Sequence, residues 1–141
     1  MSIYIIEPST FIQAVAEKLK EYTEINAPNG SEFWKTAFYK ELAPINHQTF
    51  WYIRCASLLR KIYKFGPIGV NRLRKKYGGR NKRGPGLNHS AKGSGKIIRV
   101  ALQQLENANL IVKTEKDGRI LSNEGRSLLE RTGYSISRKK S

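Results

Sequence analysis

The segment Leu42–Leu105 contains no aspartate or glutamate, although it holds fourteen of the chain's 26 lysine and arginine residues. All eleven acidic residues of the 141-residue chain lie outside this segment, and the formal net charge is +15. A soluble surface normally mixes charges of both signs. The same segment is rich in aromatic and aliphatic residues, which predicts folded structure rather than a disordered basic tail. The sequence therefore predicts a folded face that presents positive charge to a polyanion, either nucleic acid or an anionic membrane.

Long apolar runs and cysteine are also scarce. The longest uninterrupted apolar run in the basic segment is Phe50–Ile53, far short of the ~20 residues that a bilayer-spanning helix needs, so we expect no membrane partner. The apolar start Met1–Ile6 is short and has no basic leader, so we expect no signal peptide. Cys55 is the only cysteine, which excludes a disulfide within the chain and fits a cytoplasmic location.

The residues of an enzyme active site are missing as well. His47 and His89 are the only histidines, and neither has metal-ligating neighbours at suitable spacing. Cys55 lies on an apolar helical arc, which favours a buried structural role over a nucleophile. Gly93–Lys96 resembles a phosphate loop, but it lacks the first glycine of that motif and the hydroxyl residue after the lysine. The sequence predicts a protein that is not an enzyme and has no cofactor or metal.

The strongest helical pattern spans Gln48–Phe65. At about 100° per residue, its apolar side chains fall on one broad arc and its cations on the opposite arc, which predicts a central helix packed against several others. The apolar arc consists of Trp51, Cys55, Leu58, Leu59, Ile62 and Phe65, with Tyr52 and Tyr63 at its margin. The basic arc, predicted to be a strip left in solvent, contains Arg54, Ser57, Arg60, Lys61 and Lys64.

Further elements are predicted around this helix from apolar periodicity, caps and breakers. Gly78 and Gly79 are expected to end one helix because they tolerate left-handed geometry, and Asp117–Gly118 is expected to form the hairpin turn. The predicted elements are a helix over Phe11–Tyr22 capped by Ser9 or Thr10, a short helix capped by Ser31 that runs through Tyr39 and stops before Pro44, a helix over Val70–Tyr77, a long loop over Arg80–Gly95, a helix over Gly95–Ala108 capped by Ser94, a hairpin over Leu110–Leu121, and a helix over Asn123–Arg131 capped by Ser122.

This order predicts a mainly α fold: a helical bundle around a central amphipathic helix (about 48–65) with a winged-helix-like β-hairpin (about 110–121). We expect a single globular domain over residues 1–134 and a frayed basic C-terminal tail over residues 135–141. Gly66–Gly69 also matches the Gly-x-x-Gly pattern of KH modules, but a simple helix break is the favoured interpretation.

Three basic surfaces are candidates for contact with phosphates. The segment Arg72–Arg83 holds seven cations within twelve residues, which would repel one another strongly unless a polyanion neutralised them. The loop before the helix predicted at Gly95 offers backbone amides and hydroxyls, and such groups at a helix N-terminus favour anions. The hairpin cations Lys113, Lys116 and Arg119 are a weaker candidate, because Glu115 and Asp117 offset them. The candidate residues are Arg54, Arg60, Lys61 and Lys64 on the central helix; Arg72, Arg74, Lys75, Lys76, Arg80, Lys82 and Arg83 after it; and His89, Ser90, Lys92, Ser94, Lys96 and Arg99 in the following loop and helix.

The sequence leaves two kinds of nucleic-acid ligand possible, structured RNA and duplex DNA. Phosphate-dominated binding by loops fits structured RNA, which proteins recognise largely by shape. A winged-helix DNA-binding transcriptional regulator would instead aim a polar helix face at base edges. Gly95–Ala108 offers Arg99, Gln103, Gln104 and Asn107 for such a role, whereas Glu106 on the same side would repel phosphates.

Several separated motifs are distinctive. They are Lys40–Pro44, Trp51–Arg60, Tyr77–Arg80, His89-Ser90 with Gly93-Ser94, Leu102-Gln103 with Leu105-Glu106, and Gly118–Gly125. In this order they closely resemble the nineteen-e family of ribosomal proteins, from the small subunit of archaea and eukaryotes. The resemblance covers nearly the whole chain, which makes chance a poor explanation.

The resemblance implies a mostly helical protein with a winged-helix-like hairpin that binds ribosomal RNA in the head of the small subunit and takes part in subunit maturation. It implies functional positions at Arg54, Arg60, Arg80, Ser90, Lys92 and Ser94. We expect a noncatalytic structural constituent of the ribosome in the cytoplasm. Its expected partners are small-subunit ribosomal RNA and neighbouring ribosomal proteins, and the isolated protein is expected to be a monomer.

Overall fold

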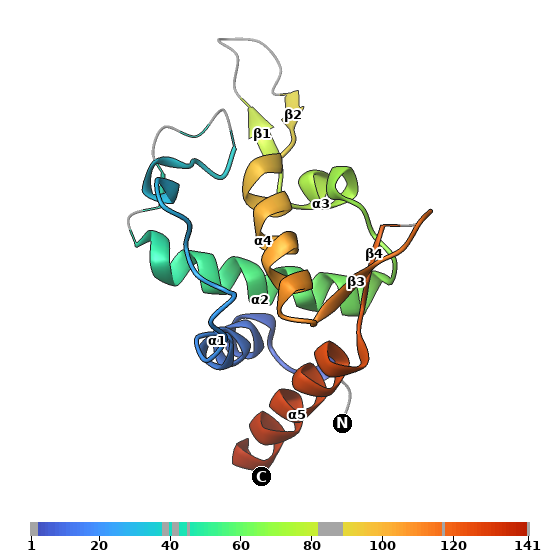
Figure 1. Ribbon diagram of the computed structural model, residues 1–141. Coiled ribbons are helices and arrows are strands. Elements are labelled where there is room, and N and C mark those ends of the chain that lie inside the picture. The colour runs from blue at the N-terminus through green and yellow to red at the C-terminus, as the bar shows by residue number, and fades with distance from the viewer. Residues whose placement is uncertain are drawn as a thin grey trace.

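The centre of the fold is helix α2 (His47–Phe65), which contacts α1 (Pro8–Leu19), α4 (Gly95–Asn107), α5 (Asn123–Lys140) and strand β4 (Arg119–Leu121) (Figure 1). The prediction of a mainly helical protein organised around this helix is confirmed. The computed structural model describes residues 3–37, 40, 43–44, 46–81, 89–116 and 118–140.

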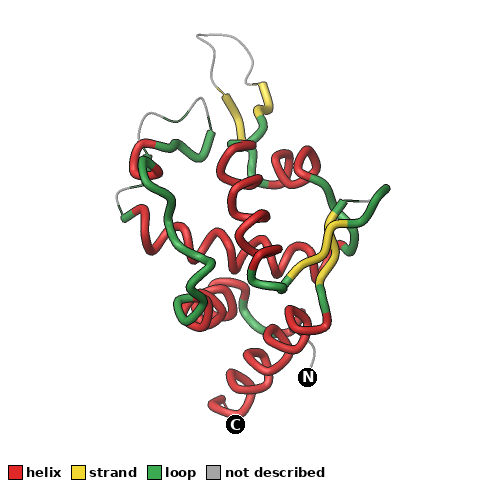
Figure 2. Tube along the Cα trace, in the orientation of Figure 1, coloured by secondary structure: helices red, strands yellow, loops and turns green. Residues whose placement is uncertain are grey.

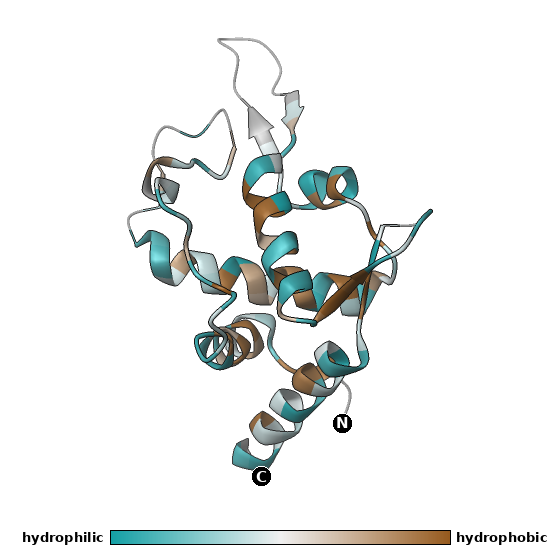
Figure 3. Ribbon diagram, in the orientation of Figure 1, coloured by the Kyte–Doolittle hydropathy of each residue, from teal (hydrophilic) through white to brown (hydrophobic). Residues whose placement is uncertain are grey.

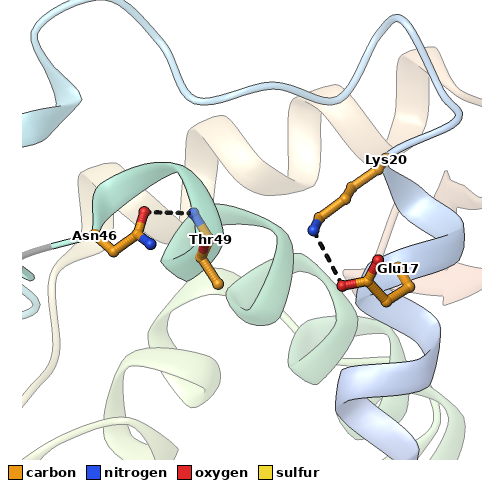
Figure 4. A network of polar contacts seen from close by, with 4 residues as sticks. All are labelled: Glu17, Lys20, Asn46 and Thr49. Carbon is orange, nitrogen blue, oxygen red and sulfur yellow. Dashed lines mark hydrogen bonds and ion pairs between the residues drawn. The ribbon is translucent and has the colours of Figure 1, made fainter.

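Helix α2 begins one residue before the predicted start and ends where predicted. The Asn46 side chain caps it by accepting a hydrogen bond from the Thr49 amide at 3.3 Å, close to the Glu17–Lys20 ion pair of α1 (Figure 4). At its end, Gly66 adopts φ +75°, a left-handed conformation that glycine tolerates. The predicted apolar arc is buried except at its end, where Phe65 is 47% exposed; the buried members are Trp51, Cys55, Leu58, Leu59 and Ile62.

A winged-helix-like unit follows α2. Short helix α3 (Val70–Lys76) leads to α4, and strand β3 (Ile111–Lys113) pairs with β4 as an antiparallel hairpin, which confirms the predicted wing (Figure 2). Ile68, in the turn between α2 and α3, bridges Arg119 through two backbone hydrogen bonds of 3.2 and 2.9 Å. The close approach requires glycine at position 118, because a Cβ atom there would collide with the Ile68 carbonyl.

The segment predicted as one long loop contains a second hairpin, so that prediction is wrong. Strand β1 (Gly79–Asn81) pairs antiparallel with β2 (His89–Ala91), with Arg80 opposite Ser90. Helix α3 ends one residue before the predicted end, but Gly78 and Gly79 do not adopt the expected left-handed geometry, since neither has a positive φ angle. Glycine is needed at position 78 because a Cβ atom would collide with the Ala91 carbonyl. The strands escape a sequence-based prediction because each has three residues and no apolar alternation.

The N-terminal elements also differ from the prediction. Helix α1 begins at Pro8 and ends at Leu19, three residues early at each end; a proline in the first turn costs no hydrogen bond. Ser9 therefore lies inside the helix, where its hydroxyl donates to the Glu7 carboxylate at 3.0 Å. Two 3₁₀ turns accompany α1: η1 (Ile3–Ile5) and η2 (Ser31–Phe33), the latter replacing the predicted Ser31 helix in its described part. Tyr39, the predicted end of that helix, lies outside the described residues.

The caps of the last two long helices match the prediction. The Ser94 hydroxyl accepts from the Ile97 amide at 3.4 Å to cap α4, and the Ser122 hydroxyl accepts from the Gly125 amide at 3.1 Å at the start of α5.

The expected fraying of the C-terminal residues is wrong, because α5 continues to Lys140 and buries Ile136. The division into one domain and a tail stays a prediction. Within the described part of the chain, no helix combines the length and apolar content needed to cross a bilayer.

Candidate nucleic-acid interface

Helix α3 presents cations to solvent because Leu73 is its only fully buried side chain. Leu73 is fully buried against the core, whereas Arg72, Lys75 and Lys76 are exposed. Figure 3 shows α3 as largely hydrophilic beside the more apolar α4. The helix packs on α4, so its cations lie next to those of the α4 N-terminus. Arg99 and Lys96 on α4 are likewise exposed.

A groove of about 730 Å³ runs between α3, α4 and the wing, and we call it the wing groove. Arg72 enters it from α3, Arg99 from α4 and Lys116 from the β3–β4 connection. The Ile68–Arg119 bridge joins the wing to the turn before α3, and the Arg119–Glu106 ion pair joins the wing to α4. None of the described residues that line the groove carries a carboxylate; these residues are Pro67, Gly69, Val70, Asn71, Arg72, Arg99, Lys116 and Gly118. Three cations around a groove with no acidic residue in its described lining favour a phosphate-bearing ligand.

A second groove, of about 280 Å³, lies at the other side of α3, and we call it the Trp34 groove. Its floor is tied together by backbone contacts: Gly93 N–H donates to the Arg74 carbonyl at 2.8 Å, and Ser94 N–H donates to the Thr36 carbonyl at 2.6 Å. The Arg74 guanidinium returns a hydrogen bond to the Gly93 carbonyl at 2.9 Å. Its lining is Trp34, Lys35, Ala37, Arg74, Lys92, Gly93, Ser94 and Lys96.

The basic strip of α2 is not left in solvent as predicted, because Tyr77 at the end of α3 covers part of it. The Arg54 guanidinium lies 4.1 Å from the centroid of the Tyr77 ring, and the Lys61 ammonium lies 5.1 Å from it. The Ser57 hydroxyl is 2.6 Å from the Tyr77 hydroxyl. Arg54 also lies 5.0 Å from the Phe50 ring. Arg54 is therefore a stacked, half-buried residue that holds α2 and α3 together.

The ionisation of this cluster reflects its burial. Burial lowers the pKa of the Arg54 guanidinium, and Tyr77 acts in the opposite direction. Burial also lowers the pKa of Lys61, with a further decrease caused by nearby cations, first of all Lys76. Burial raises the pKa of the Tyr77 hydroxyl, although its hydrogen bond with Ser57 and the Arg54 charge lower it. The cluster is therefore partly withdrawn from water.

The other cations of the strip differ in exposure. Arg60 is half-buried, and its Nε atom is buried without a hydrogen-bond partner among the described residues. Lys64 is exposed. The ring of exposed Phe65 has the Lys76 ammonium 3.5 Å and the Lys64 ammonium 5.4 Å from its centroid. This part of the strip reaches the surface at the end of α2.

Only some of the candidate residues around the β1–β2 pair belong to the described part of the chain. Arg80 lies in β1 and His89 in β2, as backbone partners of Ser90 and Asn81. Ser90 and Lys92 are exposed. Lys82 and Arg83 lie outside the described residues. Lys116 lines the wing groove, although its acidic neighbours made it only a weak candidate in the sequence. Its position in the predicted wing is the feature of the sequence that could have identified it.

Comparison with known proteins gives a clear match. The family model described as ribosomal protein S19e matches residues 2–139. The chain belongs to the ribosomal protein S19e family. It is 44% identical over 135 residues (93% of this chain, 88% of the relative) to the small ribosomal subunit protein eS19 of Haloarcula marismortui, and 46% identical over 127 residues (89% and 82%) to that of Aeropyrum pernix. It is also 39% identical over 131 residues (92% and 88%) to the small ribosomal subunit protein eS19G of Ascaris suum.

Two polar residues of α4 in this S19e family member are already engaged within the fold. The Gln104 side chain accepts from the Trp51 indole at 2.8 Å and donates to the Asn26 carbonyl at 2.9 Å. Glu106 forms an ion pair with Arg119 of the wing, so its charge is neutralised. Gln104 is therefore withdrawn from the base-reading role that the sequence suggested, and Glu106 opposes phosphates less than expected.

Metal-ligating residue types and the single cysteine of this S19e family member can be placed in the described part of the fold. Among the described residues, no three His, Cys, Asp or Glu side chains cluster as they would to hold a metal ion. Cys55 is fully buried, and burial raises the pKa of its thiol far above the ordinary value. A buried, protonated thiol is a poor nucleophile.

We therefore predict that Cys55 reacts with a thiol reagent at least about a hundredfold more slowly in the native protein than in urea, because labelling requires local opening. The rate of labelling at neutral pH, followed by absorbance, tests this. Equal rates in the two states would show that the thiol is accessible and contradict its burial.

Proposed function

We propose that this S19e family member is a noncatalytic structural constituent of the small ribosomal subunit, located in the head. It binds folded ribosomal RNA through the face formed by α3, the N-terminal part of α4 and the wing, and it supports subunit assembly and rRNA maturation on the ribosome in the cytoplasm. Its relatives are named as small ribosomal subunit proteins. Neighbouring ribosomal proteins are its further partners.

The wing groove carries this proposal. Arg72, Arg99 and Lys116 converge from three different elements on one groove, and none of the described lining residues is acidic. Phosphates on an RNA backbone bind such clustered cations by releasing counterions, which gives affinity without sequence readout. The sole acidic residue of α4, Glu106, is paired with Arg119, so the two together add no net charge and Arg72, Arg99 and Lys116 supply the positive potential of the groove.

The variant Arg72→Gln/Arg99→Gln tests the role of the groove. Both side chains are exposed, so the folding stability should change little. Binding to a small-subunit rRNA transcript should weaken about tenfold or more, and the slope of log affinity against log salt should fall by about two, since each cation neutralises one phosphate. Filter binding over a range of salt concentrations gives both quantities, and sucrose gradients report incorporation into subunits.

The matched control removes two cations from α5. Arg131 and Lys139 are also exposed, and neither lines the wing groove, so Arg131→Gln/Lys139→Gln has the same net charge but keeps the groove intact. It should bind with nearly the affinity and salt slope of the unmodified chain. Equal losses in the two variants would mean that overall charge, rather than this groove, supports binding.

A winged-helix DNA regulator remains the alternative to an RNA-binding constituent. Selection from random duplex DNA would then yield a defined sequence motif, whereas the rRNA-binding proposal predicts only weak, salt-sensitive enrichment. The engagement of Gln104 with Trp51 and Asn26 supports the RNA proposal, because it removes one of the four polar α4 residues that could read base edges.

A further inference from the structure

The Trp34 groove differs from the wing groove in having an aromatic wall. Trp34 follows η2 in an extended conformation and is partly buried, with its ring edge-on to Trp51 at 6.2 Å between centroids. The Lys96 ammonium lies over the Trp34 ring, 4.5 Å from the centroid. An ammonium group in that position shows that the ring is reachable from the groove and presents its electron-rich face.

We propose that this groove receives a single unpaired nucleotide of the bound RNA, with its base stacked on Trp34 and its phosphate between Lys92 and Lys96. This inference rests on the proposed RNA-binding function. Proteins recognise unpaired RNA bases largely by stacking them on aromatic side chains, which adds a contact that duplex RNA cannot make. Lys92 and Lys96 are exposed, and both line the groove.

The size and charge of the groove fit such a ligand. Its volume of about 280 Å³ lies at the lower end of small-molecule pockets, which suits one base and excludes a duplex. Of the eight described residues that line it, four are cationic and none is acidic. Base stacking on an aromatic ring is generally worth more than an exposed cation–π contact, so a base can displace the Lys96 ammonium. The released ammonium then stays near the phosphate of the same nucleotide.

The groove is also built before a ligand arrives. The reciprocal hydrogen bonds between Arg74 and Gly93 fix α3 against the loop that leads into α4. The Ser94–Thr36 hydrogen bond ties this loop to the segment that carries Trp34. A Cβ atom at Gly93 would lie only 3.1 Å from Tyr77, so the backbone of this loop packs closely on Tyr77. A groove that is already shaped loses less entropy on binding.

The test uses the full chain and three probes: a single-stranded RNA oligomer with one central 2-aminopurine, the same oligomer with an abasic central site, and adenosine monophosphate. We expect the oligomer with the base to bind about tenfold more tightly than the abasic one, and 2-aminopurine fluorescence to be quenched on binding. Trp34→Leu should abolish this preference, whereas Trp34→Phe should retain part of it. The control Phe33→Leu changes a neighbouring aromatic residue that is 79% exposed and does not line the groove, and it should change nothing.

The outcomes separate this inference from the proposed function. Equal, salt-dependent binding of the base-containing and abasic oligomers, without quenching, overturns the nucleotide site and leaves the RNA-binding function standing. Loss of all salt-dependent binding to RNA overturns the proposed function itself. Binding of adenosine monophosphate as tight as that of the oligomer would assign the groove to a free nucleotide and overturn its role toward RNA. Quenching in the unmodified chain can be measured even if Trp34→Leu fails to fold.

Discussion

Gly125→Ala should destabilise the protein by about 3 kcal/mol, because overpacking against backbone that cannot move costs this much. Gly125 is buried in the first turns of α5, and a Cβ atom there would collide with the Leu110 carbonyl. The collision would push α5 away from the segment that leads into the wing. Thermal denaturation followed by circular dichroism should show a melting temperature lower by about 10 °C.

Gly133→Ala is the matched control, since it adds the same methyl group to the same helix. Its Cβ atom would meet the Ile6 side chain at 3.3 Å and the Ile3 side chain at 3.5 Å, both of which can shift slightly. Alanine is favoured over glycine in a helix by up to about 1 kcal/mol, which offsets the tighter packing. A stability close to that of the unmodified chain is expected. A loss at Gly133 as large as that at Gly125 would contradict the close approach to Leu110.

Trp51→Ala should cost about 4 kcal/mol of folding stability. Trp51 is almost completely buried on α2, and deleting a buried aromatic side chain removes its burial energy and leaves a cavity. Its indole also donates to the Gln104 side chain at 2.8 Å, which joins α2 to α4. Urea denaturation should therefore show a clearly lower midpoint, and Trp34, whose ring packs edge-on against Trp51, should lose its fixed environment.

Trp51→Phe separates these two contributions. Phenylalanine keeps most of the buried apolar area but cannot donate the hydrogen bond. The Gln104 oxygen would still accept from the Asn26 amide at 3.2 Å, so the loss should be limited to about 1–2 kcal/mol. If Trp51→Phe were as unstable as Trp51→Ala, the hydrogen bond rather than the packing would dominate at this position.

Periodicity and capping residues were sufficient to predict α2 and α4, because both helices bury a continuous apolar face and α4 begins at a serine cap. The extension of α5 was missed because Gly133, Tyr134 and Ser137 are weak helix formers. The helix persists there because Ile136 packs into the core, and such tertiary contacts override local propensity.

The candidate interface was predictable in charge but not in shape. The absence of acidic residues from Leu42–Leu105 indicated the basic face, and most of the described predicted cations on α3 and α4 are exposed. Helical periodicity predicts that Arg54 lies on the face of α2 opposite the apolar arc. It does not reveal that Tyr77, at the end of α3, covers the Arg54 guanidinium. The Trp34 groove was missed because its walls come from segments about sixty residues apart.

The bridge between Ile68 and Arg119 fixes the spacing of the cations on this face. Arg119 joins the wing to the α2–α3 turn through its backbone and to α4 through its side chain, so one residue links three elements. The backbone positions that carry Arg72, Arg99 and Lys116 are therefore set by the fold itself. Under the proposed RNA-binding function, encounter with RNA would require little conformational search by these elements, and electrostatic attraction would steer a surface whose arrangement is already complete.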